Sequence, residues 1–155
     1  MTFRISGLDP AAFAHLHALS DSDLAAAGVR RVRVEHEHAA PCRISLDDAQ
    51  PGEAVLLLAH LHQAAATPYR QQGPIFVRRT MQRYDAQDTV PPALARRPLS
   101  LRGFDAAGMM IEAELCDGAD MAVTIARCFA NENVAYIHAH YARRGCFAAL
   151  IERAA

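Results

Sequence analysis

The last third of the chain alternates apolar and polar residues in two pairs of segments, and each pair is joined by a short loop that ends in glycine. The alternating segments are residues 99–104, 109–115, 134–141 and 146–151. Alternation with a period of two is typical of strands, and a short loop ending in a left-handed glycine is a common hairpin connection. Because residues 117–130 between the pairs carry apolar residues at helical spacing, we predict a C-terminal β-β-α-β-β unit.

The loop that ends at Gly108 predicts the register of the first hairpin. It places Leu99 opposite Leu115 and Leu101 opposite Ala113. Apolar side chains then meet on one face of the pair, which is what a stable register requires.

The loop that ends at Gly145 predicts the register of the second hairpin in the same way, with Ala142 opposite Cys146. One face of this hairpin is then apolar and includes Ile137, Ala139, Tyr141, Phe147, Ala149 and Ile151. The opposite face consists of Tyr136, His138, His140, Cys146 and Glu152. We therefore predict that the two histidines project together from one pleated surface.

The rest of the chain supports one fold class. We predict helices at 10–19 and 21–27, and strands at 30–38, 42–46, 54–62 and 74–79. No break divides the chain, so residues 1–155 are expected to form a single α+β domain. Its core would be a mainly antiparallel sheet with two or three helices packed on it.

The charged residues exclude several classes of protein. All 16 basic residues are arginine, which excludes Schiff-base chemistry on a side chain, phosphate-loop nucleotide hydrolysis and protein kinase chemistry, because each needs a lysine. A net charge of −1 gives no electrostatic reason to expect nucleic acid or an anionic membrane as a partner. No apolar run is long enough to span a bilayer and no signal core is visible, so we expect a soluble cytoplasmic protein with free thiols.

All eight histidines occur in pairs separated by one residue: His15 and His17, His36 and His38, His60 and His62, and His138 and His140. Residues two apart on a helix point in different directions, so the first pair cannot share a ligand. Residues two apart on a strand project from one face. The other three pairs can therefore converge on a ligand.

The face that carries His138 and His140 allows three interpretations. Imidazole and thiolate suit zinc or iron, so the two histidines and Cys146 can form a metal site, completed by His60 or His62. In the second interpretation the histidines are acid–base groups in an organic ligand pocket, with Cys146 or Cys42 as a nucleophile. In the third they are structural residues of a half-buried face, and the cysteines fill a core.

Three arginines and two tyrosines complete the candidate pocket. Arg43 lies beside Cys42, and a neighbouring guanidinium favours the reactive thiolate. Strand alternation would nevertheless turn Cys42 towards a core. Arg43, Arg70 and Arg78 can hold an anion, because the guanidinium fork matches carboxylate and phosphate oxygens. Tyr69, in the loop at 63–73, can cover the ligand, and Tyr136 lies on the histidine face.

Five further blocks are distinctive: Pro41–Leu46, Pro68–Arg70, Gly73–Arg78, Tyr136–His140 and Gly145–Phe147. Together with the opening Phe3–Leu8 they resemble a bacterial family catalogued as domain of unknown function 1203. The chain departs from that family's pattern at Tyr141, where the family has a small polar residue. The resemblance implies a bacterial, cytoplasmic, single-domain protein and no particular activity. It also implies that the shared blocks contain Cys42, Arg43, Tyr69, Arg78, His138, His140 and Cys146.

From these observations we expect a soluble domain that binds, or binds and turns over, a small anionic ligand. The ligand would lie over the sheet in a pocket lined by histidine, arginine and cysteine. One alternative is a metal-binding module that uses His138, His140 and Cys146. Another is a non-catalytic interaction protein that forms a homodimer through a sheet edge. The sequence predicts no particular cofactor.

Overall fold

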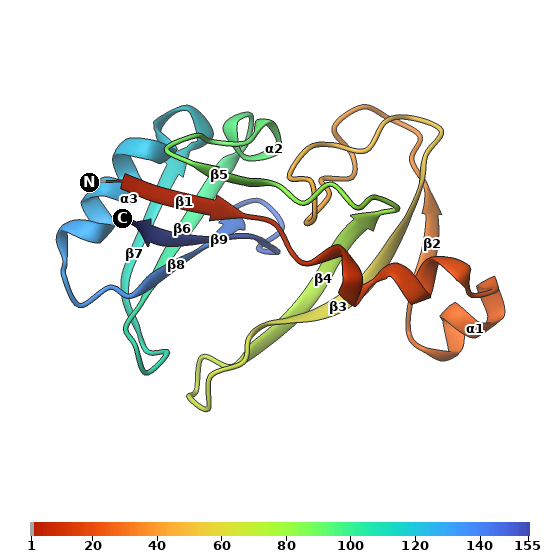
Figure 1. Cartoon of the computed structure of the whole chain (residues 1–155), viewed down its shortest axis with the longest axis horizontal. Helices are drawn as coiled ribbons and strands as arrows, with labels where there is room; N and C mark the ends of the chain where they lie inside the picture. The colour runs from red at the N-terminus through yellow and green to blue at the C-terminus, as the bar shows by residue number, and fades with distance from the viewer. Residues whose placement is uncertain (1) are drawn as a thin grey trace.

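Two antiparallel sheets form the framework, and the chain passes from the first to the second and back again (Figure 1). The computed structural model describes residues 2–155. The six-stranded sheet has the order β5-β1-β9-β8-β6-β7, and the three-stranded sheet has the order β2-β3-β4. The strands of the larger sheet are β1 (Thr2–Ser6), β5 (Asp85–Gln87), β6 (Pro98–Phe104), β7 (Met110–Asp117), β8 (Tyr136–Tyr141) and β9 (Phe147–Ala154). Those of the smaller sheet are β2 (Arg30–Arg33), β3 (Ala54–Gln63) and β4 (Gln71–Arg78).

The helices are short, apart from one that packs on the larger sheet. They are α1 (Asp21–Ala26), α2 (Pro92–Ala95) and α3 (Met121–Ala130), and the 3-10 segments are η1 (Pro10–Ala12), η2 (Ala14–Ala18) and η3 (Gly118–Asp120). The helix α3 buries Met121, Ile125 and Phe129 in the same core as the central strands. The predicted α+β class and the C-terminal β-β-α-β-β order are confirmed. No helix within residues 2–155 is long and apolar enough to cross a membrane.

The predicted helix at 10–19 is wrong in type. This segment forms two 3-10 turns, in which Phe13 N–H bonds the Pro10 carbonyl and Leu16 N–H bonds the Phe13 carbonyl. The predicted helix that follows is confirmed as α1, with the Ser20 hydroxyl accepting a hydrogen bond from Asp23 N–H.

The predicted register of the first hairpin is wrong by one residue. Leu99 pairs with Cys116, and Leu115 is 74% exposed. A β-bulge causes the shift, because Gly103 pairs with Glu112 and Phe104 with Met110, which leaves one residue of β7 unpaired. The turn itself closes as predicted, with Gly108 at a positive φ of 84°.

The second hairpin has the predicted register along most of its length and also contains a bulge. Ala139 pairs with Ala149 as expected, but His140 pairs with Phe147. The extra residue on β9 moves the Phe147 side chain from the predicted apolar face to the histidine face. Gly145 closes the turn at φ 80°, as predicted.

One predicted strand is too long and another is wrong. The strand predicted at 30–38 is confirmed as β2 but stops at Arg33, and His36 and His38 lie in the loop that follows. Residues 42–46 form a turn, in which Leu46 N–H bonds the Cys42 carbonyl and Cys42 N–H bonds the Asp47 carbonyl. Tertiary packing explains this turn, because Cys42 and Leu46 are both buried in it.

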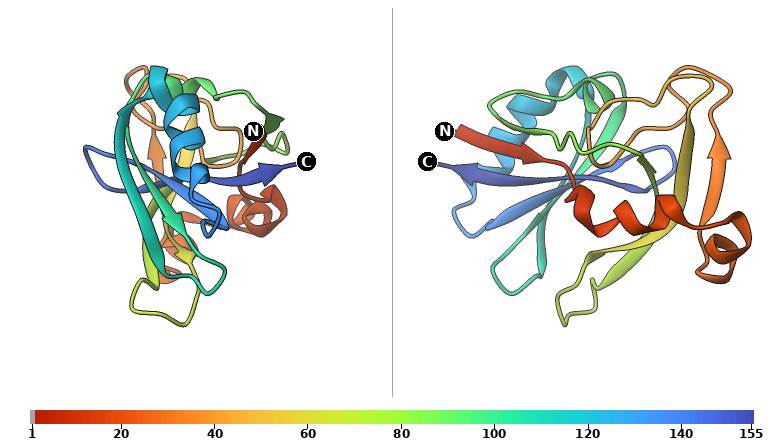
Figure 2. Two further views of the ribbon diagram at one scale, coloured as in Figure 1. Left: turned by 90° about the vertical axis from the view of Figure 1, so that its left-hand side faces the viewer. Right: turned by 45° about the vertical axis from the view of Figure 1, so that its right-hand side comes forward.

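The two sheets meet through the tips of the hairpins β3–β4 and β6–β7, which project on the same side of the molecule (Figure 2). The Thr67 hydroxyl donates to the Gly108 carbonyl across this contact, at 3.1 Å. A side chain at Gly108 would overlap Ala65, so the close approach requires glycine there. The hairpin contact closes the molecule at one end.

Candidate functional site

A pocket of about 800 Å³ lies between the two sheets. Its positive lining consists of five arginines: Arg43, Arg96, Arg97, Arg143 and Arg144. Its apolar wall consists of Leu57, Pro74, Phe76 and Pro98. Tyr141, Cys146 and His38 also line it. We call this site the arginine pocket.

Arg43 is the buried cation of the arginine pocket, with 3% of its surface exposed. Its Nε donates to the Phe147 carbonyl at 2.7 Å, and its Nη1 donates to the Pro41 carbonyl at 2.5 Å. No carboxylate among residues 2–155 forms an ion pair with it. Burial lowers the pKa of Arg43 from its usual value, but a guanidinium remains charged in proteins.

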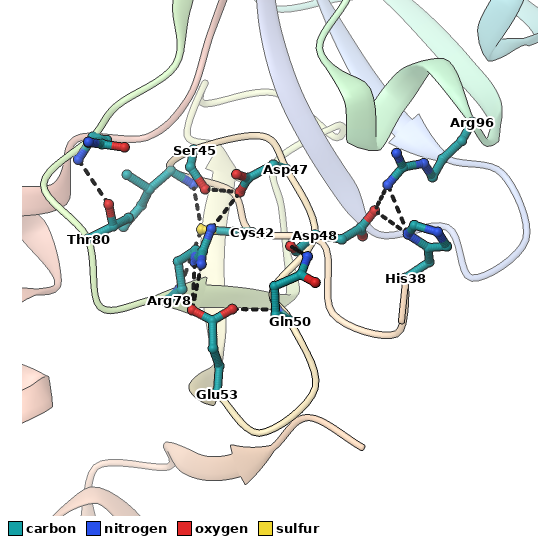
Figure 3. A network of polar contacts seen from close by, with 12 residues as sticks. His38, Cys42, Ser45, Asp47, Asp48, Gln50, Glu53, Arg78, Thr80 and Arg96 are labelled. Atoms are coloured by element: carbon teal, nitrogen blue, oxygen red, sulfur yellow. Dashed lines mark hydrogen bonds and ion pairs between the residues drawn. The ribbon is translucent and has the colours of Figure 1, made fainter. Parts of the chain in front are cut away.

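Arg96 and Arg97 share one carboxylate, that of Asp48. The Asp48 side chain is 2% exposed, with Arg97 Nη2 at 2.6 Å and Arg96 Nη1 at 2.5 Å. Burial acts to raise the pKa of Asp48, but hydrogen bonds and charge from Arg97 and Arg96 outweigh it, so the pKa lies below its usual value. His38 Nδ1 lies 3.2 Å from the same carboxylate (Figure 3).

Arg143 and Arg144 are exposed in the turn between β8 and β9. Gly145 at positive φ turns the chain directly after them. Unlike Arg96 and Arg97, their side chains form no hydrogen bond or ion pair with any part of the chain that the structure describes. They are therefore available to a ligand at the pocket.

Tyr141 places a buried hydroxyl in the same region. The guanidinium carbons of Arg43 and Arg97 lie 4.9 and 5.3 Å from the centre of its ring. Burial raises the pKa of Tyr141 to about 12, so the phenol is neutral. Within residues 2–155 its hydroxyl has no hydrogen-bond partner, which is unusual for a buried polar group.

A second candidate region is a cluster of rings between the sheets. It consists of His60 and His62 from β3, His138 and His140 from β8, and Phe147 from β9. The His62 ring stacks on Phe147 at 5.2 Å between centres and contacts His140 edge-on at 5.0 Å. We call this region the histidine cluster.

Burial keeps the histidine cluster neutral. It lowers the pKa of His138 to about 3 and that of His140 to about 4, and neighbouring histidines and Arg102 lower the first further. His138 is 5% exposed and His140 is 1% exposed. His140 Nδ1 bonds the Gly145 carbonyl at 2.9 Å, whereas Nδ1 of His138 and of His62 is buried without a partner.

The structure separates the residues that the sequence assigned to a metal site. His138 and His140 lie in the histidine cluster, whereas Cys146 lines the arginine pocket. No three histidine, cysteine or acidic side chains in the described part of the chain are arranged to hold a metal ion. The hairpin bulge contributes to this separation, because Phe147 takes the position facing the histidines.

Cys42 and Arg78 have structural partners (Figure 3). Cys42 is fully buried, and its sulfur accepts backbone N–H groups of Ile44 and Arg78 at 3.4 Å. Arg78 Nη1 bonds Asp47 at 3.0 Å, and its Nε and Nη2 bond Glu53. Cys42, one of the two expected nucleophiles, is therefore a core residue, and Arg78, one of the three arginines expected to hold an anion, is already ion-paired.

Tyr69, Arg70 and Tyr136 belong to the side of the molecule where the hairpin tips meet. Tyr136 bonds Gln63 through its hydroxyl and stacks on Phe104 at 5.4 Å. Tyr69 contacts the same Phe104 ring edge-on, and Arg70 bonds the Ala64 carbonyl. None of the three lines the arginine pocket. Of the nine predicted site residues, the structure brings only Arg43 and Cys146 together there.

Sequence reasoning missed most of the arginine pocket. Arg96 and Arg97 are adjacent in the chain, as are Arg143 and Arg144, and each pair directly precedes a Pro or Gly. These adjacent arginines next to a turn residue were the sequence signal that could have identified four of the pocket residues. Asp48 and Tyr141 gave no comparable signal, because their roles depend on segments far away in the chain.

Comparison with known proteins identifies the family. Residues 39–153 match the family model described as protein of unknown function, DUF1203. The match includes the blocks from Pro41 to Phe147 on which the sequence resemblance rests, and Phe3–Leu8 lie outside it. No curated protein and no solved structure matches the chain. The chain therefore belongs to the DUF1203 family.

Proposed function

We propose that this protein binds a small anionic molecule in the arginine pocket. The observation that carries the proposal is Arg43, a buried guanidinium that has no carboxylate partner among the residues the structure describes and lines a pocket of about 800 Å³. Burying an uncompensated charge is costly, and two carbonyl contacts offset only part of that cost. A bound anion would supply the missing negative charge.

The surrounding charges support the same conclusion. Five arginines line the pocket, and Asp48 is the one carboxylate paired with any of them among the described residues. A concave site with charges of one sign concentrates ligands of the opposite sign. The volume falls in the range of small-molecule sites, about 300–1,000 Å³.

The proposal is one of binding. Cys146 is the only one of the four expected catalytic residues that lines the pocket. His138 and His140 are packed into the histidine cluster, and Cys42 is buried in a core. Turnover would require Cys146 to act without these partners, so binding is the function that the geometry supports.

Isothermal titration calorimetry with inorganic phosphate, pyrophosphate and citrate, at low and high salt, tests the proposal. We expect saturable binding that weakens as salt increases, because the contacts are charged. Replacing Arg43 by Met should abolish binding. Since that change can also affect folding, the double variant R143A/R144A provides the second test and should weaken binding at least tenfold.

R33A is the matched control, because Arg33 is exposed, lies outside the pocket and its side chain forms no hydrogen bond or ion pair within residues 2–155. It should bind like the parent protein. The proposal is wrong if none of the three anions binds, or if R33A weakens binding as much as R143A/R144A does.

A further inference from the structure

Cys146 is the cysteine that lines the arginine pocket, and its side chain is partly exposed. We infer that Cys146 is a covalent capture site, at which a small disulfide with net negative charge is attracted by the arginines and exchanges with the thiol. This inference rests on the proposed anion site and adds a chemical step to it. Three observations carry it: the placement of the thiol, the unpaired positive charge around it, and its contrast with the other cysteines.

The turn between β8 and β9 places Cys146 on the pocket face. Tyr141 N–H bonds the Cys146 carbonyl at 2.9 Å, and Gly145 N–H bonds the Tyr141 carbonyl at 2.7 Å. Tyr141 and Cys146 are therefore opposite each other across the turn, and opposite side chains share one face. The predicted register placed Cys146 on the histidine face, and the bulge on β9 shifts it to the face of Tyr141.

The sulfur of Cys146 has little to hold it within the chain. Its one hydrogen-bond partner among residues 2–155 is the Arg144 carbonyl, at 3.9 Å. It forms no disulfide. The turn thus fixes the backbone of Cys146 and leaves its thiol free to react.

Arg43 is independent evidence that an anion belongs beside this thiol. It is 3% exposed, and no carboxylate among the described residues pairs with it. Its Nη2 makes no hydrogen bond within residues 2–155 and is not one of the buried atoms without a partner, so it opens on the pocket. Burial lowers the pKa of Arg43, and negative charge at Tyr141 and then at Cys146 acts to raise it, so the sulfur lies within electrostatic range of this guanidinium.

Two further cations adjoin the thiol in the chain. Arg143 and Arg144 are exposed, line the same pocket and form no ion pair within the described residues. No acidic side chain of residues 2–155 lines the pocket to oppose them. Charge of one sign in a concave site raises the local concentration of molecules of the opposite sign. An anionic disulfide is therefore concentrated where the sulfur can attack it.

The other three cysteines have surroundings that disfavour the same reaction. Cys42 is fully buried, and its sulfur accepts two backbone N–H groups. Burial raises the pKa of Cys128 to about 11, and two nearby glutamates act in the same direction. Cys116 is partly exposed, but burial raises its pKa and two nearby aspartates add to that effect. Reactive thiols are found in electropositive and partly exposed surroundings, which only Cys146 combines here.

The step is thiol–disulfide exchange. The Cys146 thiol loses its proton to solvent, and its sulfur attacks one sulfur of the small disulfide. The S–S bond of the small molecule breaks, a new S–S bond joins one half to Cys146, and the other half leaves as a thiolate that takes up a proton. The small disulfide is the oxidant, so one protein thiol is oxidised and one small thiol is released. The reaction is stoichiometric and requires no second catalytic group from the chain.

Three alkyl disulfides of different charge test the inference on the full chain: glutathione disulfide, which is negative, bis(2-hydroxyethyl) disulfide, which is neutral, and cystamine, which is positive. Intact-mass spectrometry at low salt follows the adduct, and peptide mapping locates it. Each rate constant is divided by that of the same reagent with a neutral cysteine derivative, because the leaving thiols differ in reactivity. We expect a single adduct at Cys146, absent in C146S, with a normalised rate roughly tenfold higher for glutathione disulfide than for the neutral reagent and lowest for cystamine.

Variants and salt separate attraction of the reagent from reactivity of the thiol. R143A/R144A should lower the normalised rate with glutathione disulfide by roughly tenfold and change the neutral rate little. High salt should have the same selective effect on the parent protein. R33A and C116S are the controls and should react like the parent, because neither residue lines the pocket.

The outcomes distinguish this inference from the proposed function. The inference is wrong if the adduct forms at another cysteine, if the three normalised rates are equal, or if R143A/R144A slows the neutral reagent as much as glutathione disulfide. Saturable binding of phosphate, pyrophosphate or citrate would in those cases leave the proposed function intact. If none of those anions binds and the normalised rates are also equal, the proposed function and the inference both fail.

Discussion

The arginine pocket and the histidine cluster use opposite faces of the same strand, β8. Tyr141 lines the pocket, and His140, the residue before it, lies in the cluster. Both regions bury titratable side chains, but imidazole can lose its charge on burial whereas guanidinium cannot. The histidines therefore pack as neutral rings, and the buried Arg43 remains a cation that has no carboxylate partner among residues 2–155.

Phe147 connects the two regions. Its ring stacks on His62 in the cluster, and its carbonyl accepts a hydrogen bond from Arg43 Nε in the pocket. The bulge on β9 makes both contacts possible, because it moves the ring to the histidine face. Packing of Phe147 in the histidine cluster thus positions the Arg43 guanidinium in the arginine pocket. We therefore expect changes in the cluster to affect stability and changes at the exposed arginines to affect anion binding.

Acid should have the largest effect, and it should act through the histidine cluster. The folded-state pKa values of His138 and His140 lie below the unfolded value of 6.5. The unfolded chain therefore binds more protons as the pH falls below 6.5, and stability is lost until the folded values near 3–4 are reached. We expect the free energy of unfolding to fall by about 5 kcal/mol between pH 7 and pH 4.

Urea denaturation followed by circular dichroism at several pH values measures this loss. H140N places an amide N–H where Nδ1 donates to the Gly145 carbonyl and removes one titrating ring, so it should reduce the pH dependence. The exposed His36 provides the control H36N, which should match the parent protein. Unchanged stability between pH 7 and pH 4 would contradict the neutral, buried cluster.

Truncating Phe147 to Ala should be the next largest change. The side chain is 4% exposed and contacts all four rings of the cluster, so its loss leaves a cavity. Chemical denaturation should show a loss of about 3–5 kcal/mol. V123A is the control, because Val123 is 63% exposed, and it should lie within about 0.5 kcal/mol of the parent.

Replacing Gly145 by Ala should have a moderate effect that reaches both regions. The φ of 80° is strained for alanine, although no atom lies within 4 Å of the new Cβ. We expect a loss of about 1 kcal/mol, measured by thermal or urea unfolding. Gly73→Ala, which also meets nothing within 4 Å and has no positive φ, should cost less. Equal costs would show that backbone conformation is not the cause.

The smallest effect on stability should come from changes to the two exposed arginines of the arginine pocket. Arg143→Ala and Arg144→Ala each remove an exposed side chain without partners in the described chain, so stability should stay within about 0.5 kcal/mol. Anion affinity should nevertheless fall, together with its dependence on salt. A large loss of stability in either variant would assign these arginines a structural role instead.

Local sequence patterns predicted much of the fold. Gly108 and Gly145 marked both C-terminal turns. The spacing of Met121, Ile125 and Phe129 placed the longest helix. These features succeed because a turn and an amphipathic face are each specified by residues close together in the chain.

The strand registers of the two C-terminal hairpins and the residues of the arginine pocket were less predictable from the sequence. Each C-terminal hairpin contains a bulge that no residue in its own sequence announces, and each bulge turns part of a strand over. The segment at 42–46 reads as a strand in isolation, yet it folds as a turn with its apolar residues buried. Packing against other segments outweighs local preference in these places.

The sequence by itself determined the fold class, the C-terminal order of strands and helix, and the presence of arginine as the only permanent cation. Only the tertiary structure decided that the histidines pack as neutral rings and that the arginines converge, because burial and charge balance depend on contacts between distant segments. Arg43 meets the carbonyl of Phe147 across 104 residues of chain, and Arg97 meets Asp48 across 49. No local sequence pattern can specify a contact between residues so far apart in the chain.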